Sequence, residues 1–188
     1  MSATGVRFPA LARDEMNDEQ REVFDRLAAS PRAGVRGPYP ALLRHPALAK
    51  VHEAYGAHVR YNNSLPDRLK EMAILIVARH WNAEYEWFAH RSHAEKAGVP
   101  AAVCDAISRG EAPEGLDAEA SAVHDFAVEL LRTRAVGDAV FARVKERFGD
   151  KGVLDLIALM GNYVTVAMIL NVDRHPVPPG ATPLPKLG

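Results

Sequence analysis

The chain has 188 residues, of which 48% are hydrophobic and 25% are charged, as in an ordinary soluble domain. Its formal net charge of −1 excludes the broad basic surface with which proteins bind nucleic acids or anionic membranes. The single cysteine, Cys104, excludes an internal disulfide, a cysteine-rich zinc site and a two-thiol redox pair within one chain, and a free thiol suits the reducing cytoplasm in which we expect this protein.

Helices are predicted along almost the whole chain, because no stretch alternates apolar and polar residues over the length of a strand. The first helix is predicted over residues 18–29, where Asn17 is a favourable N-cap and Gln20 occupies the capping-box position. Residues 30–40 are rich in Pro and Gly and are expected to form a loop. Further helices are predicted over residues 41–44, 45–61, 66–81, 83–97, 100–109, 118–134, 138–148 and 151–171.

Two of these helices are unusually apolar. The helix over residues 66–81 is apolar on nearly every side and should be central and buried. The stretch from Val153 to Val172 has the length of a membrane span, but it contains Asp155 and Asn162, which are costly inside a bilayer. We therefore interpret it as a helix buried in a soluble core or in a subunit interface, and we expect no membrane contact.

The pattern predicts one helical domain over residues 17–172, flanked by two arms. The N-terminal arm, residues 1–16, lacks the pattern of a signal peptide. The C-terminal arm, residues 173–188, is rich in Pro and should be extended, without a fold of its own. Arms of this kind often lie on a neighbouring subunit.

The residues with the clearest chemical potential are Glu86 and His90. Four-residue spacing on a helix places both side chains on one face, one turn apart. A second acid, Glu71, lies in the apolar helix just upstream. A carboxyl group and an imidazole held this close can pass a proton to and from a small substrate at neutral pH.

Three stretches, Leu69–Arg79, Glu84–His90 and Ala94–Gly98, together resemble the core motif of the carboxymuconolactone decarboxylase and alkylhydroperoxidase-D-like superfamily. The upstream segment Arg36–Leu43 is similar to the longer members of that group. The resemblance implies an all-α, alkylhydroperoxidase-D-like helical bundle whose central helical hairpin, residues 66–98, carries the site. It also implies a homo-oligomer, which would be a dimer, a trimer or a hexamer.

The motif distinguishes two branches of this superfamily. The peroxidase branch uses Cys-x-x-Cys-x-x-x-His, and aligning its histidine with His90 places its two cysteines at Ala83 and Glu86. Tyr85 then matches a tyrosine between the thiols, and Glu71 matches a supporting glutamate. Because both thiols are missing, the motif has no thiolate to attack a peroxide. The decarboxylase-like branch instead keeps Glu-x-x-x-His, which matches Glu86 and His90.

The resemblance to this branch implies a cofactor-free lyase or isomerase that acts on a small carboxylate or lactone, in aromatic-compound catabolism. We expect His90 to donate and accept the proton and Glu86 to set its tautomer or share that proton. Glu71, in apolar surroundings, should have a raised pKa and could act as an acid or hold His90 in place.

Substrate-binding residues are harder to choose. A substrate carboxylate needs a cationic partner, for which we select Arg79 over Arg91 and Arg60 without a physical reason to rank them. Tyr85 and Trp87 are expected to form walls of the site, although a large aromatic such as Trp87 also fits the core.

Other interpretations of the same residues stay open. Glu86 and His90 also fit a surface pair worth a few tenths of a kcal/mol. Together with His93 they share a helix face, but three ligands on one helix would crowd one side of an ion, so we expect no metal. The alternative function is a non-catalytic helical oligomer that binds a small ligand or a partner protein. A peroxide reductase using Cys104 ranks third.

Overall fold

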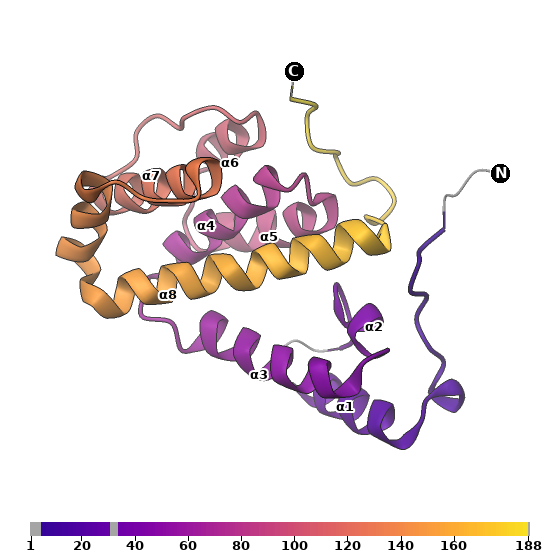
Figure 1. Cartoon of the computed structure of the whole chain (residues 1–188). Coiled ribbons are helices and arrows are strands. Elements are labelled where there is room, and N and C mark those ends of the chain that lie inside the picture. Colours follow the sequence, from indigo (N-terminus) through magenta and orange to yellow (C-terminus); the bar gives the residue numbers. More distant parts are fainter. Residues whose placement is uncertain (1–4, 31–33, 188) are drawn as a thin grey trace.

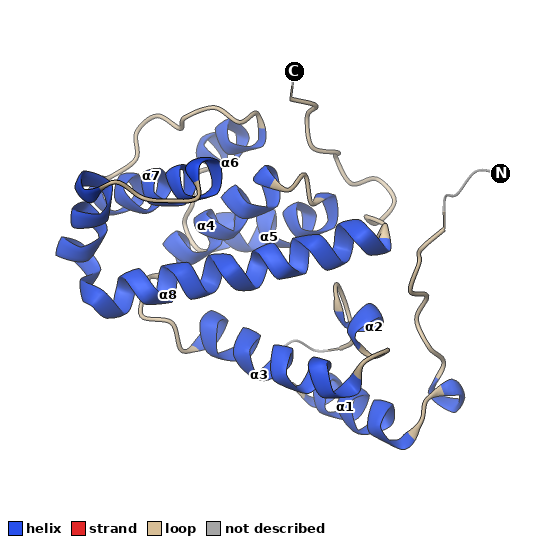
Figure 2. Cartoon of the chain, viewed as in Figure 1, coloured by secondary structure: helices blue, strands red, loops and turns tan. Residues whose placement is uncertain are grey.

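The computed structural model describes residues 5–30 and 34–187, and within these ranges the chain forms helices and loops but no strand (Figure 2). The all-α prediction is therefore confirmed. The helices are α1 (Asp18–Ala29), α2 (Tyr39–Leu42), α3 (Pro46–Tyr61), α4 (Asp67–His80), α5 (Glu84–Lys96), α6 (Ala101–Ser108), α7 (Ala118–Thr133) and α8 (Asp138–Asp173). A single 3₁₀ turn over Arg13–Glu15 precedes α1. The ends of both arms and part of the loop expected over residues 30–40 lie outside the described residues.

Local sequence signals place most helix ends correctly. The Asn17 side chain accepts a hydrogen bond from the backbone N–H of Gln20, whose side chain bonds back to Asn17, as the capping box predicts. Two boundaries were wrong. Helix α2 begins at Tyr39 instead of residue 41, because Pro40 fits the first turn of a helix, where no N–H is needed. Helix α5 begins at Glu84 instead of residue 83, because Asn82 takes a left-handed φ of 48° in the turn and Ala83 is the N-cap.

The two last predicted helices form one element, α8, with a break inside it. Gly149 has φ 65° and ψ −176°, outside the helical region and open essentially to glycine alone. The two legs of α8 thus correspond to the predicted helices on either side of this residue. By length and composition, α8 is the one helix of the described part that could cross a membrane, but half of its most apolar window is buried inside the fold. We interpret it as a core helix.

Helix α4 is the centre of the larger core and contacts α5, α6, α7 and α8 (Figure 1). Every residue from Leu69 to Arg79 is buried, which explains why this helix is apolar on all sides without any need for a subunit interface. One face of α8 leaves Leu154, Ile157 and Met168 exposed. The expected homo-oligomer stays a prediction.

A second, smaller core joins α1, α2 and α3. It is built around buried apolar side chains that include Val23, Leu27 and Leu43. Helix α3 connects the two cores, because the Tyr55 hydroxyl donates to the Ala158 carbonyl of α8 (2.9 Å) and Lys70 Nζ of α4 donates to the Arg60 carbonyl (3.0 Å). A cavity lies where these two cores meet.

The described part of the C-terminal arm is extended and lies on its own chain. The Leu184 N–H donates to the Glu84 carboxylate (2.9 Å), and Arg79 Nη1 donates to the Pro185 carbonyl (2.9 Å). The arm thereby covers the turn between α4 and α5, as Figure 1 shows for the yellow end of the chain.

Candidate functional site

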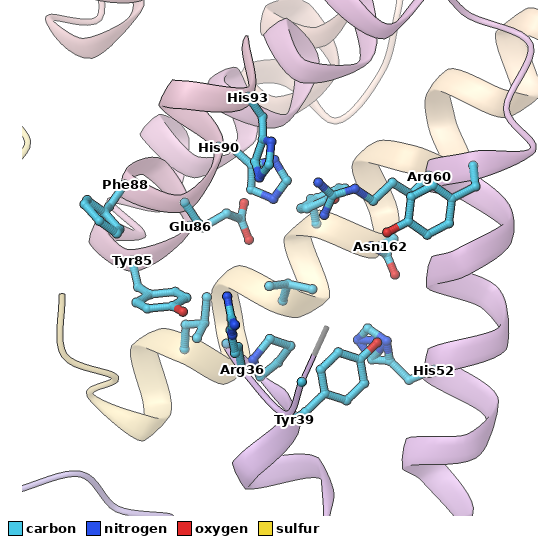
Figure 3. Close-up of a pocket in the computed structure, with 18 residues that line it drawn as sticks. Arg36, Tyr39, His52, Arg60, Tyr85, Glu86, Phe88, His90, His93 and Asn162 are labelled. Atoms are coloured by element: carbon cyan, nitrogen blue, oxygen red, sulfur yellow. The ribbon is translucent and has the colours of Figure 1, made fainter. Parts of the chain in front are cut away.

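A cavity of about 420 Å³ opens between α5, α8 and the cap formed by α3 and the segment before α2 (Figure 3). Its chemistry is mixed, with titratable side chains on the α5 wall and aromatic rings around them. The lining consists of Gly34, Arg36, Gly37, Pro38, Tyr39, His52, Arg60, Tyr61, Tyr85, Glu86, Phe88, Ala89, His90, His93, Asn162, Tyr163, Val166 and Leu170. A cavity of this size and mixture is suited to a small organic molecule.

His90 and Glu71 form a buried pair at the back of this cavity. The antiparallel packing of α4 on α5 brings them together, and His90 Nδ1 lies 2.7 Å from Glu71 Oε2. An ionised carboxylate can only accept, so Nδ1 carries the proton and Nε2 is left as the basic ring nitrogen. The Tyr163 ring packs edge-on against the imidazole at 4.9 Å between centroids, which fixes its orientation.

The electrostatics of this pair correct one expectation. Burial alone would raise the pKa of Glu71, but the hydrogen bond from His90 and the charges of His90 and Arg60 outweigh it, so its pKa is lowered. The expectation of a raised pKa for Glu71 was therefore wrong, because it took into account the apolar surroundings of the carboxylate but not the cations that face it. Burial lowers the pKa of His90 despite Glu71, so the imidazole is neutral and basic near neutral pH.

Glu86 lines the same cavity as His90. Its side chain is 1% exposed, and neither carboxyl oxygen has a hydrogen-bond partner within the described residues. Burial therefore raises its pKa well above the ordinary value, which favours the protonated form of Glu86. It does not set the tautomer of His90, which Glu71 does instead. A surface pair of Glu86 and His90 is also wrong, because His90 is only 6% exposed.

Across the cavity, α3 and α8 supply a cation and an amide. Figure 3 shows the Arg60 guanidinium facing the side of the cavity that holds Glu86 and His90. Arg60 Nη2 lies 3.9 Å from Glu71 Oε1. The buried Asn162 Oδ1 has no hydrogen-bond partner within the described part of the chain. Arg60 and Asn162 are thus placed to hold a polar group of a bound molecule.

Of the three predicted binding residues, the cavity includes one. Tyr85 lines it, next to Gly37, and its ring packs edge-on against His175 at 4.4 Å between centroids. Gly37 has a φ of 59°, which lets the backbone approach Tyr85 closely. Trp87 is buried in the main core on another face of α5, and Arg79 lies in α4 beside the C-terminal arm. Neither reaches this cavity, because neighbouring positions on a helix point in different directions.

The structure gives little support to a metal site or to a reactive thiol. Within residues 5–30 and 34–187, no three His, Cys, Asp or Glu side chains are grouped as a metal site. Cys104 is a buried residue of α6, where burial raises the pKa of its thiol to about 11. A thiol with so little thiolate is a poor nucleophile.

Sequence reasoning missed several side chains of the cavity. Tyr39 and His52 come from the consecutive helices α2 and α3, and Asn162 and Tyr163 come from α8, far away in the chain. The one usable signal was the pair Asn162-Tyr163, a polar group and an aromatic ring within an otherwise apolar helix.

Comparison with solved structures identifies the fold. A peroxidase-related protein from Ralstonia eutropha JMP134, described as an alkylhydroperoxidase AhpD core, superposes with a TM-score of 0.72 at 16% identity, covering 89% of each chain. A peroxidase-related protein from Silicibacter sp. TM1040 gives 0.69 at 16% identity, covering 93% of this chain and 91% of the other. A cysteine-to-alanine variant of the debrominase Bmp8, in complex with 2,3,4-tribromopyrrole, gives 0.72 at 13% identity, covering 93% of both.

The class of protein follows from the fold and these likenesses: it is an all-α protein with an internal cavity between a helical hairpin and its cap. More particularly, the chain has the AhpD-like fold, without the paired cysteines of the peroxidases. No protein-family model matches the sequence. No curated protein matches it either.

Proposed function

We propose that the protein is a cofactor-free acid–base enzyme, a lyase or isomerase that acts on a small carboxylate or lactone. The observation that carries this proposal is the division of roles on one cavity wall. His90 is a base oriented by an ionised Glu71, and Glu86 is a buried acid with no partner in the described protein. A carboxyl group that favours its protonated form can donate a proton to a substrate, and a neutral imidazole can accept one.

The reaction balances without any redox partner. In a decarboxylation, the bond from carbon to the leaving carboxylate breaks and its electron pair moves to a conjugated carbonyl oxygen. Glu86 then gives its proton to the carbon that lost the carboxylate, as the electron pair returns and the C–H bond forms. Solvent returns a proton to Glu86. In an isomerisation, His90 Nε2 removes a proton from a carbon beside the carbonyl, Glu86 donates a hydrogen bond to the enolate oxygen, and the protonated His90 returns the proton to another carbon of the enolate.

We assign substrate binding to Arg60 of α3 and Asn162 of α8, which line the same cavity. Burial alone would lower the pKa of Arg60, but Tyr163 and Glu71 outweigh it and raise the pKa, so the guanidinium stays charged. We assign Arg60 to an anionic group of the substrate and Asn162 Oδ1 to a donor group. The debrominase of the same fold binds a small ring compound, 2,3,4-tribromopyrrole, which supports a small cyclic ligand in this cavity.

The test is turnover of a panel of small unsaturated lactone acids, followed by ultraviolet absorbance and released carbon dioxide. Glu86→Gln should keep the fold, judged by circular dichroism, and lose at least about 100-fold in the rate of either reaction, the usual contribution of a positioned acid or base. His90→Asn should also keep the fold and lose as much in the rate of isomerisation. The matched controls are Glu95→Gln and His58→Asn, which change the same residue types at exposed positions and should leave the rate unchanged.

Two results would contradict the proposal. Full turnover by both cavity variants would remove these residues from the chemistry. Binding of panel compounds without any turnover, unchanged in both variants, would instead favour the non-catalytic ligand-binding oligomer.

A further inference from the structure

A second cavity lies between α4, α6 and α7, closed on one side by the C-terminal arm. It has a volume of about 500 Å³ and shares no lining residue with the first cavity. Its walls combine polar side chains with the aliphatic side chains of Ile76, Ile107, Val128, Leu131 and Leu187. Helices α6 and α7 lie on the far side of α4 from the cap helices (Figure 1), so the two cavities lie in different parts of the fold.

Arg79, which lines this cavity, is a buried cation. Its residue is 5% exposed, and Nη1 donates to the Pro185 carbonyl (2.9 Å). The charge of Glu84 acts on the guanidinium, but no carboxylate of the described residues lies within ion-pair distance of it, and the buried Nε has no hydrogen-bond partner among them. Nε and Nη2 form the edge with which arginine takes a carboxylate side-on through two parallel hydrogen bonds. Within the described part of the chain, that edge has no acceptor.

Such an arrangement is unusual for a structural arginine. Buried charges in proteins are normally paired, because an unpaired charge loses its hydration without compensation. The charge of Glu84 acts on Arg79, but its carboxylate accepts a hydrogen bond from the Leu184 N–H. Arg79 thus binds the arm through one nitrogen, and its guanidinium is in ion-pair contact with no carboxylate of the described residues.

The other charges around the cavity are mostly positive or neutral. Arg132 lies at the exposed rim, and His80 and His124 contribute from α4 and α7. The one acid of the lining, Glu111, is held by Arg109 at 2.7 Å. An anion entering this cavity therefore meets no unpaired acid.

We propose that this cavity binds an aliphatic carboxylate, with the carboxylate on the free edge of Arg79 and the hydrocarbon chain against the aliphatic walls from α4, α6 and α7. This site is separate from the proposed catalytic cavity and does not depend on its activity. The arginine supplies charge and direction, and the aliphatic walls select against strongly polar anions.

The experiment measures binding of octanoate to the full chain by isothermal titration calorimetry, with octanol as the uncharged counterpart. Octanoate should bind to the unmodified protein, and Arg79→Gln should weaken it at least tenfold while octanol binding stays the same. Val128→Phe fills the cavity from α7 without touching the arginine and should weaken both compounds. This second variant keeps the test valid if Arg79→Gln does not fold.

Arg60→Gln reports on the first cavity and distinguishes the two sites. Octanoate binding that survives in Arg60→Gln and is lost in Arg79→Gln supports the proposal. Loss in Arg60→Gln alone, binding that survives Val128→Phe, or no binding at millimolar octanoate would overturn it. A change of sedimentation state in Arg79→Gln would also overturn it, because the missing anion would then belong to a second copy of the chain.

Discussion

The protonation of Glu86 makes a prediction that needs no substrate. Burial raises the pKa of this carboxyl above its ordinary value of 4.5, so between pH 4.5 and its folded pKa the folded chain keeps a proton that the unfolded chain releases. Stability is therefore fully present below pH 4.5 and is lost progressively as the pH rises toward the folded pKa. One proton of difference corresponds to a slope of about 1.4 kcal/mol per pH unit. Glu86→Gln removes this dependence while keeping the size and shape of the side chain.

The assay is urea unfolding of both proteins at intervals from pH 5 to pH 9, at one fixed protein concentration. The free energy of unfolding of Glu86→Gln, relative to the unmodified protein, should rise with pH at about 1.4 kcal/mol per unit and then level off at the folded pKa of Glu86. Glu114→Gln, in the exposed loop before α7, is the control and should show no such trend. A flat difference for Glu86→Gln would refute the reasoning, since Glu86 would then be ionised in the folded protein and could not be the acid.

Three further predictions concern other parts of the structure. Glu71→Gln removes the charge that favours the imidazolium, so the pKa of His90 should fall further in an NMR titration; a rise would place the Nδ1 proton elsewhere. Cys104 should react with iodoacetamide at least about 100-fold more slowly in the native than in the unfolded protein, because a pKa near 11 instead of 9.0 lowers the thiolate fraction by that factor; equal rates would contradict the burial. Gly149→Ala should destabilise the protein by about 1–3 kcal/mol in urea unfolding through backbone strain, whereas Gly161→Ala, at an exposed helical position of α8, should stabilise it by up to about 1 kcal/mol, and equal effects would argue against the break in α8.

The local parts of the fold were readable from sequence. Asn17 and Gln20 marked the start of α1, and the apolar run from Leu69 identified the central helix, because capping and burial leave direct residue patterns. The break at Gly149 was also visible as a gap between two predicted helices. The start of α2 was missed, because proline marks both loops and first helical turns.

The site was readable only in part. Glu86 and His90 line one cavity because they lie one turn apart on one face of α5, and Tyr85 lines the same cavity from the adjacent position. Of the two roles expected for Glu71, its contact with His90 supports the one in which it holds the imidazole, and Glu86 makes no such contact. The protonation of Glu71 and Glu86 depends on which cations and donors face each carboxyl, and those come from other helices.

The sequence by itself determined that this chain is helical, that its hairpin carries two acids and an imidazole, and that it lacks the thiols of a peroxidase. These properties follow from residue types and their short-range spacing, which do not depend on how distant parts of the chain pack together. Only the tertiary structure decided that Arg60 faces the hairpin while Arg79 faces a separate cavity, and that the pKa of Glu71 is lowered while that of Glu86 is raised. Charge and solvation act through space, so they are set when distant helices pack together.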